Sequence, residues 1–376
     1  MVVLRYFMGW WPSKIVCVLN IILMVGYISI SAVIGGQMLS AVSGDGEGQM
    51  SIVVGIVVVE VVILVVAVFG MRAFHAYERY AWLPQLMVLF VLVGCAGPYF
   101  DVSLQSTTTQ LAASRISFLS LCLYAPASWV GAASDFYVYY PERTSKVKVF
   151  LLTCTGLWLS FTFVFMLAIG LATGMSTHQG WADASAVSTG ALIVSAFQPL
   201  GDFGRFCAVI VALGLIANST PGTYAAALGF QVLGRYPKKI PRWAWTCVVV
   251  VLELVLALAG REHLFVILQN FLALMGYWTE LMVCIVAEEH FFFRRGKLGF
   301  DWTRWEDKSY LPVGWAALVA FLLGWVGSVL GMYQIWYVGP LAEKAGLADI
   351  GMWVGSGFAL AVFPPLRYLE LRIVGR

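Results

Sequence analysis

Long apolar stretches separated by short polar connections dominate the pattern of this chain. Ten of them are about 20 residues long, the length of a helix that crosses the hydrocarbon core of a bilayer. They cover residues 14–42, 51–71, 83–100, 115–140, 148–173, 206–233, 244–260, 264–287, 312–332 and 348–366. The pattern predicts an all-α polytopic membrane protein, with a single multi-pass transmembrane domain over residues 1–376.

Charged residues predict how the chain is oriented in the lipid bilayer. They make up only 11% of the sequence, and most of the 23 Lys and Arg residues fall in the connections on one side of the predicted spans. Since Lys and Arg collect in cytoplasmic loops, we expect both termini to face the cytoplasm. The net charge of +3 follows from these loops and indicates no nucleic-acid partner.

The spans show none of the residue groupings that metal binding or catalysis requires. All seven cysteines lie inside apolar stretches, at spacings that fit neither a disulfide framework nor a metal site. The spans also lack a His-rich cluster, a Ser–His pair and paired aspartates at catalytic spacing. We therefore expect no metal and no cofactor, and we do not expect an enzyme.

Two segments resemble each other in matching register. Ile34-Gly-Gly-Gln-Met-Leu39 resembles Leu228-Gly-Phe-Gln-Val-Leu233, and the span after each carries one glutamate in an apolar run, Glu60 and Glu253 respectively. The two copies are five spans apart, an odd number, so they would have opposite orientations in the membrane. The pattern predicts an inverted repeat of the kind found in transporters, with a chance match of Gly, Val and Leu as the alternative.

Two spans carry helix-breaking residues in their middle. Pro126 and Gly131 interrupt the fourth span, and Asn218-Ser-Thr-Pro-Gly-Thr223 interrupts the sixth. Backbone groups freed from a helix at this depth must be buried in protein or line a water-filled site. We therefore predict two broken helices beside a substrate site near the midplane. A simple proline kink is the alternative for each span.

Several motifs together resemble a known family over essentially the whole chain. They are Gly9-Trp-Trp-Pro-Ser-Lys14, Leu19-Asn20, Gly35-Gly-Gln37, Ala133-Ser-Asp-Phe136, Tyr140-Pro141 and the segment from Asn218 to Gln231. This set resembles the fungal purine-cytosine permeases of the nucleobase-cation symporter family. The resemblance implies a leucine-transporter-type inverted-repeat fold of twelve spans.

The ten predicted spans correspond to the third through the twelfth of that family, so we expect the family's first two spans to be absent. Residues 1–113 would then be the remainder of the first repeat and residues 114–287 the second repeat. Residues 288–376 would form two extra C-terminal spans.

The resemblance also implies a substrate site, formed by Tyr27, Ser31, Trp129, Asn218, Pro221 and Gly222. Tyr27 and Ser31 share a helix face, at positions where the family's purine transporters tend to have Trp and Asn. Trp129 would stack on a flat heterocycle from the side opposite Tyr27. Gly222 replaces an asparagine of the family pattern, and ordinary helix packing is the alternative role of Tyr27 and Ser31.

Three carboxylates within the spans are candidates for proton coupling: Asp135, Glu60 and Glu253. A carboxylate among apolar helices can take up a proton on one side of the membrane and release it on the other. Asp135, beside the break in the fourth span, is the most direct candidate. Structural hydrogen bonds are the alternative for Glu60 and Glu253.

The resemblance implies a symporter of the fungal plasma membrane that carries a purine or cytosine base with protons. Its partners would be the heterocyclic substrate, protons and the lipid bilayer. Two alternatives stay open. One is a vitamin B6 or thiamine transporter of the same family, and the other is a truncated, non-transporting paralogue or nutrient sensor.

Overall fold

The computed structural model describes residues 1–44, 49–69, 71–101, 111–138, 140–141, 143–294 and 300–376. Most of these residues are helical, and the β-pairing among them is a single bridge between Tyr333 and Val338. The predicted all-α class is therefore confirmed.

The long helices follow the order of the predicted spans. They are α2 (Pro12–Val42), α3 (Ile52–Phe69), α4 (Met71–Ala96), α5 (Leu111–Ala127), α7 (Lys146–Gly174), α10 (Gly201–Val232), α12 (Arg242–Gly260), α13 (Leu264–Glu288), α14 (Trp315–Gly331) and α16 (Gly351–Val374). The short helix α6 (Val130–Tyr137) completes the fourth span after α5. The short helices are α1 (Leu4–Met8), α8 (Gln179–Val187), α9 (Thr189–Ser195), α11 (Arg235–Lys239) and α15 (Pro340–Lys344). A π-helical turn over Glu289–Arg294 continues α13.

Eight helical segments of the described chain are long and apolar enough to cross a membrane, and they match the first eight predicted spans. The last two predicted spans are also helical but differ from the rest. Helix α14 has only 17 residues. Helix α16 continues past the predicted end at residue 366, because Arg367 and Glu370 in its last turns are buried in ion pairs.

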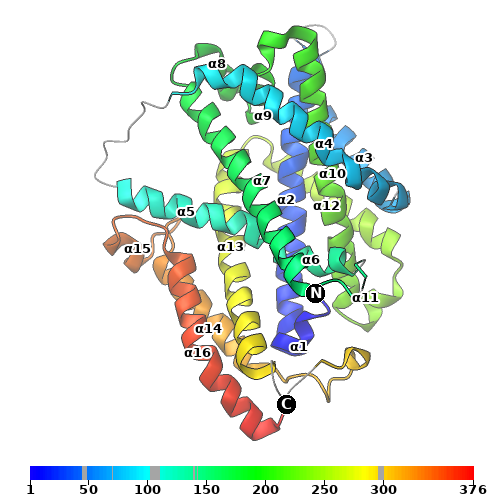
Figure 1. Cartoon of the computed structure of the whole chain (residues 1–376), viewed down its shortest axis with the longest axis vertical. Coiled ribbons are helices and arrows are strands. Elements are labelled where there is room, and N and C mark those ends of the chain that lie inside the picture. The colour runs from blue at the N-terminus through cyan, green and yellow to red at the C-terminus, as the bar shows by residue number, and fades with distance from the viewer. Residues whose placement is uncertain (45–48, 70, 102–110, 139, 142, 295–299) are drawn as a thin grey trace.

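Helix α2 runs through the centre of the bundle (Figure 1) and packs against α3, α10 and α12. These four helices all contact one another, and we call them the scaffold. Glycines bring their backbones together, as small residues do between membrane helices. A Cβ added to Gly36 of α2 would lie 2.7 Å from the backbone nitrogen of Ile56 on α3, and Gly55 faces Gly36 directly.

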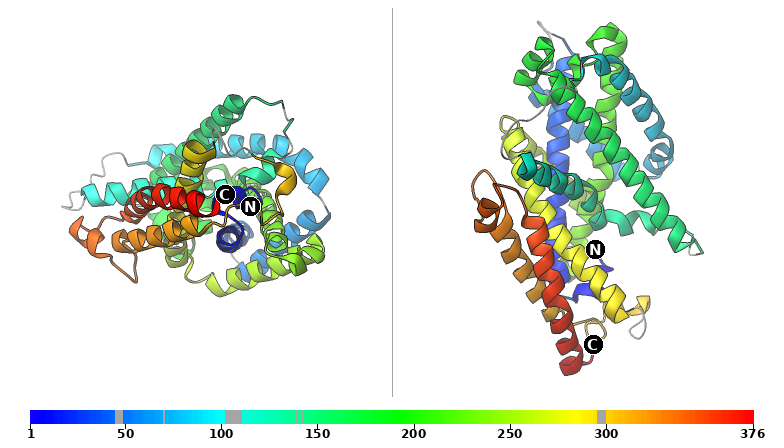
Figure 2. Two further views of the ribbon diagram at one scale, coloured as in Figure 1. Left: turned by 90° about the horizontal axis from the view of Figure 1, so that it is seen from below. Right: turned by 60° about the vertical axis from the view of Figure 1, so that its left-hand side comes forward.

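A second group of helices forms one side of the molecule. Helices α13, α14 and α16 lie side by side (Figure 2) and pack on one another, and α13 also contacts α5. Helix α5 runs across the long axis of the bundle instead of along it (Figures 1 and 2). Both termini lie in the lower part of Figure 1, together with α1 and α11.

Candidate functional site

The fourth predicted span is broken where the sequence predicts it. Helix α5 ends at Ala127 and α6 begins at Val130, so Ser128 and Trp129 form the junction. The backbone tightens there, with the Trp129 N–H donating to the Pro126 carbonyl at 3.2 Å. The Ser128 hydroxyl donates to the Ala125 carbonyl at 2.6 Å. A serine hydroxyl therefore replaces part of the hydrogen bonding that the helix loses at this point.

The predicted break in the sixth span is wrong, because α10 is one continuous helix that includes Pro221. Hydroxyls on the same helix stabilise this segment. Ser219 donates to the Leu215 carbonyl at 2.8 Å and Thr220 donates to the Ile216 carbonyl at 3.0 Å. Membrane helices tolerate proline where Ser or Thr side chains and neighbouring helices satisfy the surrounding backbone.

Tyr27 connects α2 to the break in the fourth span. Its hydroxyl lies near the side chain of Ser128, the residue before Trp129. The Tyr27 ring packs edge-on against Phe271 of α13, with ring centroids 5.6 Å apart. Ser31, one turn further along α2, donates its hydroxyl to the Tyr27 carbonyl at 2.9 Å. Tyr27 therefore meets the junction, whereas the Ser31 hydroxyl is bonded within its own helix.

The other predicted substrate residues divide into two sets. The Trp129 ring packs on Phe136 with centroids 4.7 Å apart, and its Nε1 is buried without a hydrogen-bond partner in the described chain. Gly222 faces α2, where an added Cβ would lie 2.9 Å from the Ile28 side chain. Half-buried Pro221 precedes it, whereas Asn218 is exposed on α10. The structure thus places Tyr27 beside the break at Ser128 and Trp129 and places Gly222 against α2, but it leaves Asn218 on the exposed face of α10.

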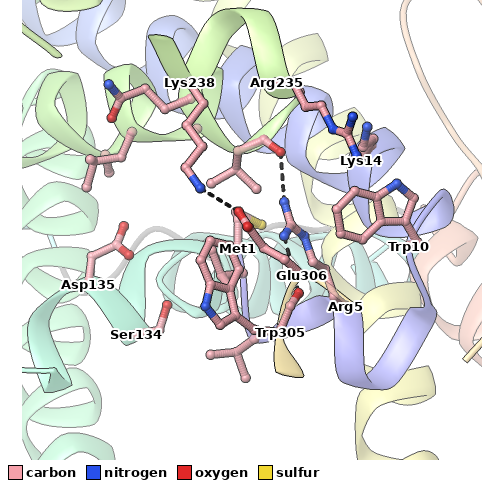
Figure 3. Close-up of a pocket in the computed structure, with 18 of the residues that line it drawn as sticks. Met1, Arg5, Trp10, Lys14, Ser134, Asp135, Arg235, Lys238, Trp305 and Glu306 are labelled. Atoms are coloured by element: carbon pink, nitrogen blue, oxygen red, sulfur yellow. Dashed lines mark hydrogen bonds and ion pairs between the residues drawn. The ribbon is translucent and has the colours of Figure 1, made fainter. Parts of the chain in front are cut away.

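A cavity of about 1350 Å³ lies at the end of the bundle that carries the termini (Figure 3). Ser134 and Asp135 of α6 line one side of it, and Arg5, Trp10 and Lys14 lie across from them. None of the six predicted substrate residues lines this cavity. Asp135 therefore lines a cavity at this end of the bundle, and this cavity is separate from the junction at Tyr27.

Most of the charged residues around this cavity are basic: Arg5, Lys14, Arg235, Lys238, Lys239 and Lys308. Burial lowers the pKa of the Arg5 guanidinium, and the charge of Glu306 opposes that shift. Arg5 donates to the Val232 carbonyl at 3.0 Å, and Lys238 forms an ion pair with Glu306 at 2.5 Å (Figure 3). These contacts hold α1 and the end of α10 around the cavity entrance.

The two matched glutamates are both buried inside the scaffold. Glu60 of α3 and Glu253 of α12 are 1% and 0% exposed, and they interact electrostatically. The Thr223 hydroxyl of α10 donates to the Glu253 carboxylate, 3.2 and 3.3 Å from its two oxygens. Both Glu60 carboxylate oxygens are buried without a hydrogen-bond partner in the described chain.

The two matched glutamines both form hydrogen bonds outside their own helices, one as acceptor and one as donor. The Gln37 side-chain oxygen, near the end of α2, accepts a hydrogen bond from the Gly190 N–H of α9 at 3.1 Å. The Gln231 side chain, near the end of α10, donates to the Ile240 carbonyl at 2.9 Å. Each glutamine therefore ties the end of its helix to the segment beside it, and the predicted repeat stays a prediction.

Sequence reasoning missed one buried polar cluster, formed by Tyr277, Gln334 and Asp349. Its members come from α13 and from the connection between α14 and α16. The signal that was available is Asp349 itself, an acidic residue placed directly before an apolar helix. Nothing in the local pattern shows that Tyr277, 72 residues earlier, provides its hydrogen bond.

Comparison with known proteins places these features in a family context. A family model described as "Permease for cytosine/purines, uracil, thiamine, allantoin" matches residues 1–355. The chain is 35% identical to the purine-cytosine permease fcyB of Emericella nidulans, over 100% of this chain and 74% of that protein. It is 33% identical to the vitamin B6 transporter TPN1 of Saccharomyces cerevisiae, with the same coverage. It is 31% identical to the yeast purine-cytosine permease FCY2, over 100% of this chain and 72% of FCY2. The family and these relatives are permeases and not enzymes.

Proposed function

Because the chain belongs to the family of permeases for cytosine/purines, uracil, thiamine and allantoin, we propose that it takes up a small planar nitrogen heterocycle together with protons. The substrate would be a purine or cytosine base. The chain would reside in the plasma membrane with both termini in the cytoplasm, where the positive-inside rule puts its basic connections.

The observation that carries the proposal is the contact between Tyr27 and the broken span. An aromatic ring on the central helix meets, through Ser128, the junction that holds Trp129. Gly222 of α10 packs on α2 at Ile28, the residue after Tyr27. Aromatic rings stack on flat heterocycles, and the Trp129 Nε1, which has no partner among the described residues, adds a hydrogen-bond donor. Uptake would proceed by motion of the broken span against the scaffold, as in transporters with repeats.

Vitamin B6 is the second candidate substrate. A relative named as a vitamin B6 transporter is 33% identical over the full chain. In this chain the substrate-site positions on α2 carry the hydroxyl groups of Tyr27 and Ser31, which suit a pyridine ring with hydroxymethyl substituents.

Uptake in cells that lack their own permeases tests the proposal. The cells produce the full chain and receive labelled cytosine, adenine, pyridoxine or thiamine, with and without a protonophore. We expect accumulation of one class of heterocycle and its loss when the proton gradient collapses. Trp129→Ala should abolish uptake, whereas Trp158→Ala, whose side chain is 68% exposed on α7, should leave it unchanged.

Different outcomes separate the alternatives. Accumulation of pyridoxine and not of cytosine or adenine would replace the nucleobase by vitamin B6 as the substrate. Normal uptake by the Trp129→Ala variant would remove this residue from the site. A protein that reaches the cell surface and accumulates none of the four compounds would overturn the nucleobase proposal and favour a non-transporting sensor.

A further inference from the structure

Three cations surround the Trp10 ring, which lies between α1 and α2. The Arg5 guanidinium is 4.3 Å from the centroid of this ring, and the Nζ atoms of Lys14 and Lys308 are each 5.2 Å from it. All four residues line the cavity of Figure 3, and we call them the Trp10 cluster. Like charges held this close repel one another, so the cluster favours an anionic ligand in the cavity.

The carboxylates that line the cavity form no ion pair with this cluster. Glu306 pairs with Lys238 at 2.5 Å, and Asp307 pairs with Arg304 at 2.5 Å. Asp135 lies on α6, across the cavity from the cluster (Figure 3). Among the residues that the structure describes, no ion pair includes any of the three cations of the cluster. Their positive charge is therefore available to a ligand.

Two nitrogen donors of the cluster are also without a partner. Arg5 is only 4% exposed, and its two terminal nitrogens donate to the carbonyls of Val232 and Trp305 at 3.0 and 3.4 Å. Its Nε, however, is buried without a hydrogen-bond partner in the described part of the chain, and so is Trp10 Nε1. Buried donors without a partner cost free energy. A ligand with several acceptor oxygens beside the cluster would offset that cost.

Exposed aromatic rings beside the cations favour a lipid as the source of the anion. Trp11 is 63% exposed, and Lys14 and Lys308 lie over its ring at 4.8 and 5.3 Å. Tyr236 lines the cavity and is 83% exposed, with Lys239 5.9 Å from its ring centroid. Trp and Tyr side chains collect at the headgroup level of a membrane. Basic pockets at the cytoplasmic ends of membrane helices bind phosphate-bearing headgroups.

We propose that this cavity binds the headgroup of an anionic phospholipid of the cytoplasmic leaflet, with its phosphate beside the Trp10 cluster. The lipid lies between α1, the end of α10 and the segment 305–308. The Arg5–Val232 and Lys238–Glu306 contacts already join these segments, and the headgroup adds a counter-charge that they share. The choice of leaflet rests on the orientation given under the proposed function, whereas the headgroup chemistry does not.

Native mass spectrometry of the purified full chain in detergent tests the site. Phosphatidylserine or phosphatidylcholine with identical acyl chains is added, and the fraction of protein that holds one lipid is measured. Phosphatidylserine should bind about tenfold more tightly than phosphatidylcholine, since each basic side chain near an anionic lipid contributes to its attraction. The Lys14→Gln/Lys308→Gln variant should lose this preference. Equal affinity of the wild type for the two lipids would overturn the proposal.

Two matched variants separate the cavity from overall charge. Lys146→Gln/Lys148→Gln removes the same charge from exposed residues at the start of α7, outside the cavity, and should retain the preference for phosphatidylserine. Lys14→Arg/Lys308→Arg preserves the charge of the cluster and should bind like the wild type. Loss of the preference in the α7 variant as well would show that overall charge selects the lipid, and it would overturn the proposal.

Thermal unfolding distinguishes the source of the phosphate and excludes a folding defect. Phosphatidylserine should raise the unfolding temperature of the wild type, because a ligand of the folded state stabilises it, and not that of Lys14→Gln/Lys308→Gln. In phosphatidylcholine alone the two proteins should unfold at the same temperature. An equal rise with millimolar inorganic phosphate would overturn the lipid and assign the site to a soluble phosphate. The lipid preference in a protein that accumulates no heterocycle would support the site and reject the transport function.

Discussion

The Tyr277 hydroxyl of α13 donates to the Asp349 carboxylate and lies 2.9 Å from each of its oxygens. Gln334 donates to the same tyrosine oxygen at 2.9 Å. The Asp349 backbone then binds α5, because its N–H donates to the Ser117 hydroxyl at 2.8 Å and its carbonyl accepts from Ser120 at 3.2 Å. The first half of the broken span is therefore attached to the segment before α16 through one aspartate.

Tyr277→Phe should destabilise this attachment. The substitution preserves the ring but leaves a buried carboxylate and a buried amide with fewer partners, which typically costs about 1–3 kcal/mol. The thermal unfolding temperature of the purified protein should fall. Tyr236→Phe is the matched control, because that tyrosine is 83% exposed and should leave the temperature unchanged. Equal unfolding temperatures for wild type and Tyr277→Phe would show that the hydrogen bond contributes little.

The spans were predictable because length and apolarity are local properties of the sequence. The break at Ser128 and Trp129 was predictable for the same reason, since Pro126 removes a donor wherever it occurs in a helix. The same reasoning, applied to Pro221, wrongly predicted a break in α10. There, hydroxyls at Ser219 and Thr220 and close packing on α2 keep the helix continuous, and only the fold shows that packing.

The candidate proton site was predictable only in part. The matched register identified Glu60 and Glu253 as equivalent positions in the sequence. It did not show that Thr223 donates to Glu253, because this contact depends on how α10 and α12 pack. Asn218 shows the reverse situation. The motif placed it in the substrate site, whereas the helical phase of α10 directs it to an exposed face.

Gly36→Ala should separate α2 from α3. An added Cβ would lie 2.7 Å from the Ile56 backbone nitrogen, and backbone cannot move aside as a flexible side chain does. Overpacking of this kind costs about 1–3 kcal/mol. Gly94→Ala is the control, because nothing lies within 4 Å of its added Cβ. The yield of folded protein and its unfolding temperature should fall for Gly36→Ala alone. A fall of equal size in both variants would show that the contact with Ile56 is not the cause, since alanine favours a helix more than glycine does.

Glu289→Gln should be more destabilising than loss of an exposed ion pair. Glu289 is fully buried between Arg294 at 3.0 Å and Arg367 at 2.8 Å, so the substitution leaves two buried guanidinium groups without a counter-charge from this position. Breaking such a pair costs about 3–5 kcal/mol. Glu306→Gln removes the ion pair between Glu306, which is 51% exposed, and Lys238, which is 56% exposed. This change should lower the free energy of unfolding by about 1 kcal/mol or less. Equal losses in denaturant unfolding would mean that water reaches Glu289 as readily as Glu306. A large loss for Glu289→Gln alone would show that this carboxylate holds the ends of α13 and α16 together.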